Sequence, residues 1–141
     1  MVIPYLLFNG QCEEAFRWYA DIFGGKIEHI SKYSDAPDAM FGHMDAAARS
    51  RVMHAHLAIA GGALSGGDAT EDTPATTCNQ LSIHVMMDNL SQAKKAFDAL
   101  SEGGTPTYQL VPNPPPDDGS ASGTVTDKYG FQWIITATSN G

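Results

Sequence analysis

Three histidines are the side chains of this sequence best suited to chemistry. His54 and His56 lie two residues apart in the segment 51–60, and His84 lies in the segment 81–87. Both segments have the short apolar pattern of β-strands, in which side chains two residues apart point to the same face. Neutral imidazoles bind zinc, nickel and iron, and an imidazole can also act as a general base or bind a polar or anionic ligand. One hypothesis is a divalent transition metal held by His54, His56 and His84, and the other is a metal-free cavity wall.

Alternation along three predicted strands assigns these histidines to the concave face of a sheet, opposite the rows that pack on helices. The rows predicted to pack on helices are Met53, Ala55, Leu57 and Ile59, then Leu81, Ile83 and Val85, then Phe131, Trp133 and Ile135. The concave rows are Val52, His54, His56 and Ala58, then Ser82, His84 and Met86, then Gln132, Ile134 and Thr136. These concave rows hold no carboxylate, which usually completes a catalytic metal site, so we expect no cofactor.

Apolar residues complete a predicted ligand-binding wall. Leu6 and Phe8 of the first predicted strand and Met86 of a later one are expected to face inward and line the cavity. The full predicted ligand-binding set is Leu6, Phe8, His54, His56, His84, Met86 and Gln132. The loop 34–50 is predicted to be a lid, because its otherwise polar sequence carries the apolar residues Met40, Phe41 and Met44.

Two copies of a strand-helix unit are expected to position these side chains. The apolar run 3–8 is followed by Asn9, a predicted helix cap, and by a helical stripe that ends at Gly24-Gly25. A second apolar run, 81–87, is followed by the cap Asp88-Asn89 and by a stripe that ends at Gly103-Gly104. The corresponding caps and glycine pairs are about 79 residues apart, which indicates a duplication.

Each predicted helix is followed by three predicted strands, so that each half of the chain reads βαβββ. In the first half the strands are 26–33, 51–60 and 63–65, with a turn at Gly61-Gly62, and in the second half they are 105–111, 122–126 and 131–138, with a turn at 127–130. The prediction is a single α+β domain, 1–141, built from modules 1–70 and 79–141. The loops 34–50 and 113–120 are expected to be mobile or to act as lids.

Composition narrows the class of protein. The 141 residues are 43% hydrophobic and 17% charged, which excludes intrinsic disorder. A net charge of −8 with scattered basic residues argues against nucleic acid as a partner, and the apolar runs fall short of the roughly 20 residues that span a membrane. Cys12 and Cys78 are expected to be reduced and structural. We therefore expect a soluble, cytoplasmic protein that binds a small molecule or another protein.

Six ordered pieces of the sequence resemble the PhnB-like branch of the vicinal oxygen chelate superfamily, which includes glyoxalase I, extradiol dioxygenases and bleomycin-resistance proteins. The pieces are Pro4–Gly10 with Cys12–Phe16, Phe23-Gly24-Gly25, Tyr33–Pro37, Val52–Leu57, Leu100–Gly104 and Val125–Trp133. The resemblance implies two curved mixed sheets that form a cleft with helices outside, and pairing of chains as homodimers. In metal-using relatives the ligands come from positions that correspond to Pro4, Ser65, Ser82 and Ile134, none of which is a good ligand.

The resulting function hypothesis is a glyoxalase-like, bleomycin-resistance-like protein that binds or sequesters a small, largely apolar ligand without the superfamily metal. The alternative is a metal-dependent lyase, isomerase or dioxygenase in which His54, His56 and His84 form an improvised site. A second alternative is a structural or regulatory homodimer whose groove binds another protein.

Overall fold

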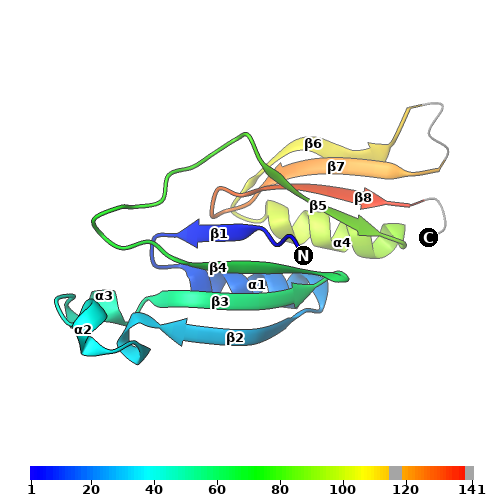
Figure 1. The fold of residues 1–141 in the computed structure, drawn as a ribbon. Coiled ribbons are helices and arrows are strands. Elements are labelled where there is room, and N and C mark those ends of the chain that lie inside the picture. The colour runs from blue at the N-terminus through cyan, green and yellow to red at the C-terminus, as the bar shows by residue number, and fades with distance from the viewer. Residues whose placement is uncertain (115–118, 139–141) are drawn as a thin grey trace. The chain divides into compact units, whose positions relative to one another are not determined.

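The computed structural model describes residues 1–114 and 119–138, and the chain divides into two compact units, Met1–Thr76 and Thr77–Gly141. Each unit contains one four-stranded mixed sheet and one long helix (Figure 1), so the predicted α+β class with two βαβββ modules is confirmed. Within the described ranges, no helix has the length and apolar character needed to cross a membrane.

The first unit, residues 1–76, has the strand order β1-β4-β3-β2, in which β1 runs parallel to β4 and the other neighbours are antiparallel. Its main elements are β1 (Tyr5–Phe8), α1 (Cys12–Phe23), β2 (Lys26–Lys32), β3 (Val52–Ile59) and β4 (Gly62–Asp68). The strand β4 is longer than the predicted 63–65. The hairpin before it turns at Ala60 and Gly61, whose φ angles are 47° and 77°, rather than at Gly61-Gly62.

The second unit, residues 77–141, has the equivalent strand order β5-β8-β7-β6, again with its first and last strands parallel. Its elements are β5 (Ser82–Met87), α4 (Leu90–Ser101), β6 (Thr105–Pro112), β7 (Ala121–Thr126) and β8 (Gln132–Ala137). The turn between β7 and β8 falls at 127–130, as predicted. Two units with the same element order and the same sheet order support the predicted duplication.

Each long helix packs its apolar stripe on one face of its own sheet. The fully buried residues of α1 are Cys12, Ala15, Phe16 and Tyr19, and those of α4 are Ala93, Ala96, Phe97 and Leu100. A glycine in each sheet makes room for the helix: a Cβ on Gly66 would lie 2.8 Å from the Phe16 ring, and one on Gly123 would lie 2.8 Å from the Phe97 ring.

The glycine pairs that follow the two long helices have the same structural roles in both units. Gly24 and Gly103 have φ angles of 65° and 73°, the left-handed conformation that ends a helix. A Cβ on Gly25 would collide with the carbonyl oxygen of Ala58 in β3, and a Cβ on Gly104 would collide with that of Thr126 in β7. Both glycines of each pair are therefore required, the first for its conformation and the second for close backbone approach.

A buried aspartate fixes the start of α1. Asp68, at the end of β4, is 2% exposed, and its Oδ1 accepts hydrogen bonds from the backbone N–H groups of Gly10 (2.9 Å) and Cys12 (3.0 Å). Its Oδ2 accepts from the N–H of Val52 at the start of β3 (2.8 Å). The predicted cap Asn9 is wrong, because its side chain instead exchanges hydrogen bonds with the backbone of Ala75. In the second unit, Asn89 caps α4 by accepting from the N–H of Gln92.

A second buried aspartate organises the turn after β7. The Oδ1 of Asp127 accepts from the backbone N–H groups of Tyr129 (2.9 Å) and Phe131 (3.0 Å), and its Oδ2 accepts from the indole Nε1–H of the buried Trp133 (2.9 Å). The carboxylate therefore holds the turn against the core of its own unit.

The segment between β2 and β3 is folded rather than a plain loop. It contains η1 (Tyr33–Asp35), α2 (Asp38–Phe41) and α3 (Ala46–Arg49), and a 2.7 Å ion pair joins Asp38 to Arg49. The other predicted loop, 113–120, is closed by a hydrogen bond from the N–H of Asn113 to the carbonyl of Ser120, while 115–118 lie outside the described residues.

Cys12 is fully buried beneath this framework. The pKa of the Cys12 thiol is raised to about 12. Burial is the largest cause, and the nearby carboxylates of Asp68 and Glu13 act in the same direction. Cys78 is exposed. The two thiols are both free, and only Cys78 is accessible to a reagent in the folded chain.

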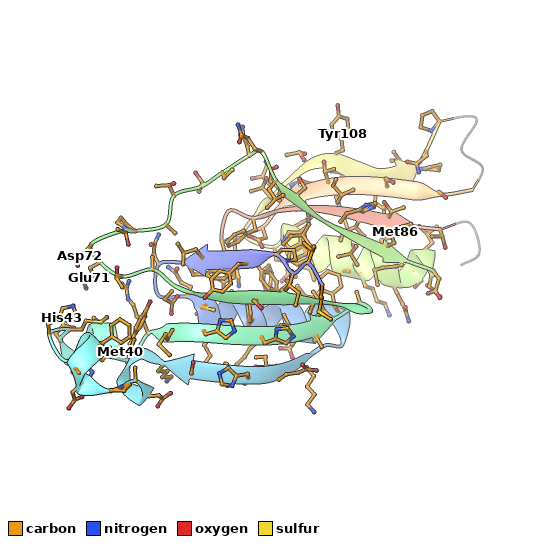
Figure 2. The ribbon with its side chains drawn as sticks, in the orientation of Figure 1. Met40, His43, Glu71, Asp72, Met86 and Tyr108 are labelled. Carbon is orange, nitrogen blue, oxygen red and sulfur yellow. The ribbon has the colours of Figure 1, made fainter. Side chains whose placement is uncertain are left out.

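Replacing Asp68 with Asn should destabilise the protein by about 2 to 3 kcal/mol, because an amide cannot accept hydrogen bonds through both of its heavy atoms and the buried N–H groups lose a charged acceptor. Urea denaturation followed by circular dichroism measures the change. The matched control is Asp72→Asn in the exposed loop after β4 (Figure 2), expected to change stability by less than about 0.5 kcal/mol. Equal stability of the two variants would contradict the role of Asp68.

The folded protein should expose one reactive thiol to dithionitrobenzoate at about pH 8, and denaturant should expose both. At that pH a thiol with the pKa of Cys12 is only about one part in ten thousand thiolate, and it is also shielded. The Cys78→Ser variant should show no fast reaction when folded. Reaction of Cys12 as fast as that of Cys78 would show that its surroundings are not closed.

Candidate functional site

In unit 1, α1 covers one face of the sheet (Figure 1), and the other face is called here the open face of unit 1. His54 and His56 lie on the open face. Their alternate neighbours Ala55, Leu57 and Ile59 are buried, as predicted. Val52 is also buried, and its predicted place on the concave row is wrong. The reason is a β-bulge at Met53: Ser31 pairs with His54 but Lys32 pairs with Val52, which shifts Val52 to the helix side.

Three rings come together on the open face of unit 1. The ring of His54 stacks on that of Tyr5, with centroids 5.7 Å apart and planes at 26°, and lies 6.0 Å from the ring of His29. His29 pairs with His56 across β2 and β3 and therefore points to the same face. His29 lies on an outer strand and is not among the predicted site residues; the single-residue bulge at Glu28 that sets its direction leaves no clear signal in the sequence.

A glycine of β4 allows Tyr5 to reach across to β3. A Cβ on Gly67 would lie 2.9 Å from the Tyr5 hydroxyl and 2.7 Å from the carbonyl oxygen of Met53. With no side chain there, the Tyr5 hydroxyl comes within 3.4 Å of that carbonyl, and the ring lies against His54. Partial burial, together with Cys12, Tyr33 and Asp68, raises the pKa of Tyr5, so its hydroxyl stays neutral.

His56 is held on both sides. Its Nδ1 lies 3.1 Å from the Ser65 hydroxyl, and its Nε2 lies 3.7 Å from the carboxylate of Glu28. A carboxylate beside Nε2 favours a hydrogen on that nitrogen and leaves Nδ1 to accept from the serine. In contrast, no hydrogen bond joins a ring nitrogen of His29 or His54 to any residue of the described ranges 1–114 and 119–138.

Leu6 and Phe8 do not line this face, and their prediction as inward-facing wall residues is wrong. Both are 3% exposed, and the Phe8 ring meets the Phe16 ring of α1 edge-on at 6.0 Å. The alternate residues Tyr5 and Leu7 take the open face instead. The apolar run 3–8 lacks a polar row, so alternation within it could not show which row faces the helix.

The second unit presents a different open face, on which hydroxyl and amide groups accompany one imidazole. The Nε2 of His84 lies 2.9 Å from the Thr136 hydroxyl, which in turn lies 3.1 Å from the Ser122 hydroxyl. Ser82 donates to the amide oxygen of Gln132 at 3.4 Å. The predicted residues His84 and Gln132 thus lie on neighbouring strands.

Three further apolar residues, in β5 or just before it, have clear positions. Met86 is 63% exposed (Figure 2), in the same row as His84. Leu81, which was predicted to pack on α4, is 70% exposed and precedes β5, so that prediction is wrong. Val85 is buried as expected.

The predicted lid residues lie in the folded segment that follows β2 (Figure 2). Met40 is exposed, whereas the Phe41 ring meets the Tyr33 ring edge-on at 4.9 Å. The Tyr33 hydroxyl donates to the backbone carbonyl of Asp68 at 2.8 Å, and burial and the Asp68 carboxylate raise the pKa of Tyr33. The segment is therefore tied to its own unit through Phe41 and Tyr33, and Met44 is half-buried beside it.

The described part of the chain contains no set of side chains that fits the metal hypothesis. In residues 1–114 and 119–138, no three histidine, cysteine, aspartate or glutamate side chains are grouped so that they could hold a metal ion. Of the three proposed ligands, His54 and His56 belong to the first unit and His84 belongs to the second.

Comparison with known proteins places this architecture. A family model described as 3-demethylubiquinone-9 3-methyltransferase matches residues 1–136. The structure is similar to that of PA1353 from Pseudomonas aeruginosa, with a TM-score of 0.82 and 30% identity over 98% of this chain and 97% of that one. It is also similar to the PhnB protein of Bacillus cereus, with a TM-score of 0.78 and 23% identity over 97% of this chain and 98% of that one.

A more distant likeness is to a fosfomycin resistance protein. The fosfomycin resistance protein FosX of Listeria monocytogenes matches with a TM-score of 0.62 and 11% identity over 98% of this chain and 92% of that one, which shows the fold alone. The family match over nearly the whole chain and the paired βαβββ units agree with each other. The chain therefore belongs to the family described as 3-demethylubiquinone-9 3-methyltransferase, in the PhnB-like branch of the vicinal oxygen chelate superfamily.

Proposed function

We propose that the protein binds a small planar organic molecule on the open face of unit 1, without the metal that enzymes of the superfamily use. The observation that carries this proposal is the group of three rings of Tyr5, His54 and His29. Aromatic and imidazole rings offer flat apolar area together with polar edges, which suits stacking with a planar ligand. The partners of His56, namely Ser65 and Glu28, leave the other two imidazoles available to a ligand.

The character of the proposed ligand follows from the side chains that remain on this face. Leu6 and Phe8 belong to the core, so the ligand would meet aromatic and imidazole rings rather than an aliphatic wall. A planar molecule with polar substituents fits this surface better than the largely apolar ligand expected from the sequence. His84, Met86 and Gln132 on the second unit are kept as proposed ligand contacts of that unit, where they present neutral donors and acceptors.

Two further statements belong to the same proposal. Superfamily members are often dimers that bind small molecules, and we propose that this chain also forms a homodimer, which sedimentation would detect. We also retain the cytoplasm as the proposed location.

Naphthol is a suitable probe for the binding proposal because it is planar and uncharged near neutral pH. We expect it to bind the protein saturably, and Tyr5→Leu should weaken binding by about threefold to tenfold through loss of one ring contact. Isothermal titration calorimetry measures both constants. The matched control is Tyr108→Leu, on the exposed strand β6 of the other unit (Figure 2), which should leave the affinity unchanged. Absence of saturable binding, or equal effects of both variants, would overturn the site.

The same titration separates metal-free binding from the metal-dependent alternative. Protein purified without chelators should contain less than about a tenth of an equivalent of transition metal, and added zinc, nickel or iron should not change the affinity for naphthol. Nearly one equivalent of a metal that is needed for binding would contradict the proposal.

Replacing Gly67 with Ala should displace the Tyr5 ring and end its stacking on His54, because the added Cβ would stand where the Tyr5 hydroxyl and the Met53 carbonyl now lie. The imidazole proton resonances of His54 should shift, and naphthol affinity should fall by about fivefold. The control is Gly62→Ala in the same strand, where the nearest atom to a Cβ is 3.8 Å away. Unshifted His54 resonances in the Gly67→Ala variant would show that this glycine does not position Tyr5.

A further inference from the structure

The charges around the open face of unit 1 differ from those of the chain as a whole. The sequence carries 16 acidic and 8 basic residues and has a net charge of −8. On this face His29, His54 and His56 lie together, and the carboxylate of Glu28 lies 3.7 Å from the Nε2 of His56. Lys26 pairs with Ala58, in the same row of the sheet as His54 and His56, and adds a cation at the end of the row. The face is therefore more favourable to an anion than the rest of an acidic chain.

The imidazoles on this face are not equivalent. His56 lies between the Ser65 hydroxyl and the Glu28 carboxylate, so each of its ring nitrogens already has a partner within the protein. His29 and His54 have no such partner in residues 1–114 and 119–138. Every imidazole carries at least one N–H donor, whichever tautomer it adopts. The two rings thus offer a pair of donors that no residue of the described ranges occupies.

The spacing of these two rings suits one small acceptor. Their centroids are 6.0 Å apart and their planes make an angle of 44°. The two oxygens of a carboxylate can each accept a hydrogen bond of about 2.8 Å from a different ring at such a separation. Tyr5, stacked on His54 on the side of β1, supplies the flat surface for the body of the same molecule.

We propose that the ligand is a planar aromatic carboxylate whose ring stacks beside Tyr5 and His54 and whose carboxylate accepts hydrogen bonds from the ring N–H groups of His29 and His54. This inference rests on the proposed function and names its ligand class. The carboxylate of Glu28 near His56 makes a doubly charged ligand, such as a phosphate monoester, less favourable than a singly charged one. The class is therefore a monoanion.

A matched pair of probes tests the charge of the ligand. Naphthoate and naphthamide have the same ring system and nearly the same shape, but only naphthoate is an anion near neutral pH. We expect naphthoate to bind at least about fivefold more tightly than naphthamide by calorimetry, because its hydrogen bonds are charge-assisted. Raising the salt concentration should weaken naphthoate binding and leave naphthamide binding nearly unchanged.

Variants of the histidines test the donors. His29→Gln and His54→Gln should each reduce the preference for naphthoate over naphthamide by about threefold or more. His43→Gln, in the exposed segment between α2 and α3 (Figure 2), is the control and should leave the preference unchanged. Both His29 and His54 lie on the surface of the sheet, so the melting temperatures of the His29→Gln and His54→Gln variants should stay close to that of the parent protein. The comparison of the two probes on the parent protein needs no variant at all.

The outcomes separate this inference from the function on which it rests. Equal binding of naphthoate and naphthamide at the Tyr5 site would overturn the anion inference and leave the binding proposal intact. Binding of neither probe, nor of naphthol, would overturn both. A preference for naphthoate that survives His29→Gln and His54→Gln but is lost on replacing Lys26 would place the anion elsewhere on the face and would overturn the assigned donors.

Discussion

The carboxylate of Asp68 is the interaction on which the first unit depends. It is buried and accepts hydrogen bonds from the backbone N–H groups of Gly10, Cys12 and Val52, so one side chain joins the end of β4 to the start of α1 and to the start of β3. A negative charge at the N-terminus of a helix is favourable because the first N–H groups lack partners within the helix. The same contact fixes the chain two residues before His54. The start of β3, which carries His54 to the open face, is therefore held in place by a carboxylate at the end of the neighbouring strand β4.

The last four residues of β4 show how one strand serves both faces of a sheet. Ser65 approaches His56 on the open face, and Gly66 leaves space on the opposite face for Phe16 of α1. Gly67 leaves space on the open face for Tyr5, and Asp68 ends the strand at the helix. A glycine in a strand usually weakens it, and two in succession are tolerated here because each is filled by an aromatic ring from a neighbouring element.

Most of the fold was predictable from the sequence, because apolar spacing and glycine pairs are visible in the sequence itself. The apolar stripe from Cys12 to Tyr19 predicted the first helix, and the glycine pairs predicted where both helices end. The 79-residue spacing predicted two equivalent units. The errors arose where the pattern was silent. The run 3–8 is apolar throughout, so the burial of Leu6 and Phe8 could not be assigned, and bulges at Glu28 and Met53 change which side chains share a face without changing composition. The partner of α1, Asp68, is 56 residues away from Cys12 and could not be found by local capping rules.

The two units keep the same scaffold but carry different chemistry on their open faces. The glycine pairs Gly24-Gly25 and Gly103-Gly104 end the long helices of the two units. In each unit a helix phenylalanine packs over a sheet glycine, namely Phe16 over Gly66 and Phe97 over Gly123. One face bears three imidazoles, and the other bears a chain of hydroxyls that begins at His84. Since the residues that hold each unit together are separate from those on its open face, the side chains of either open face can change without disturbing the contacts between helix and sheet. One scaffold can therefore carry different surface chemistry in its two copies.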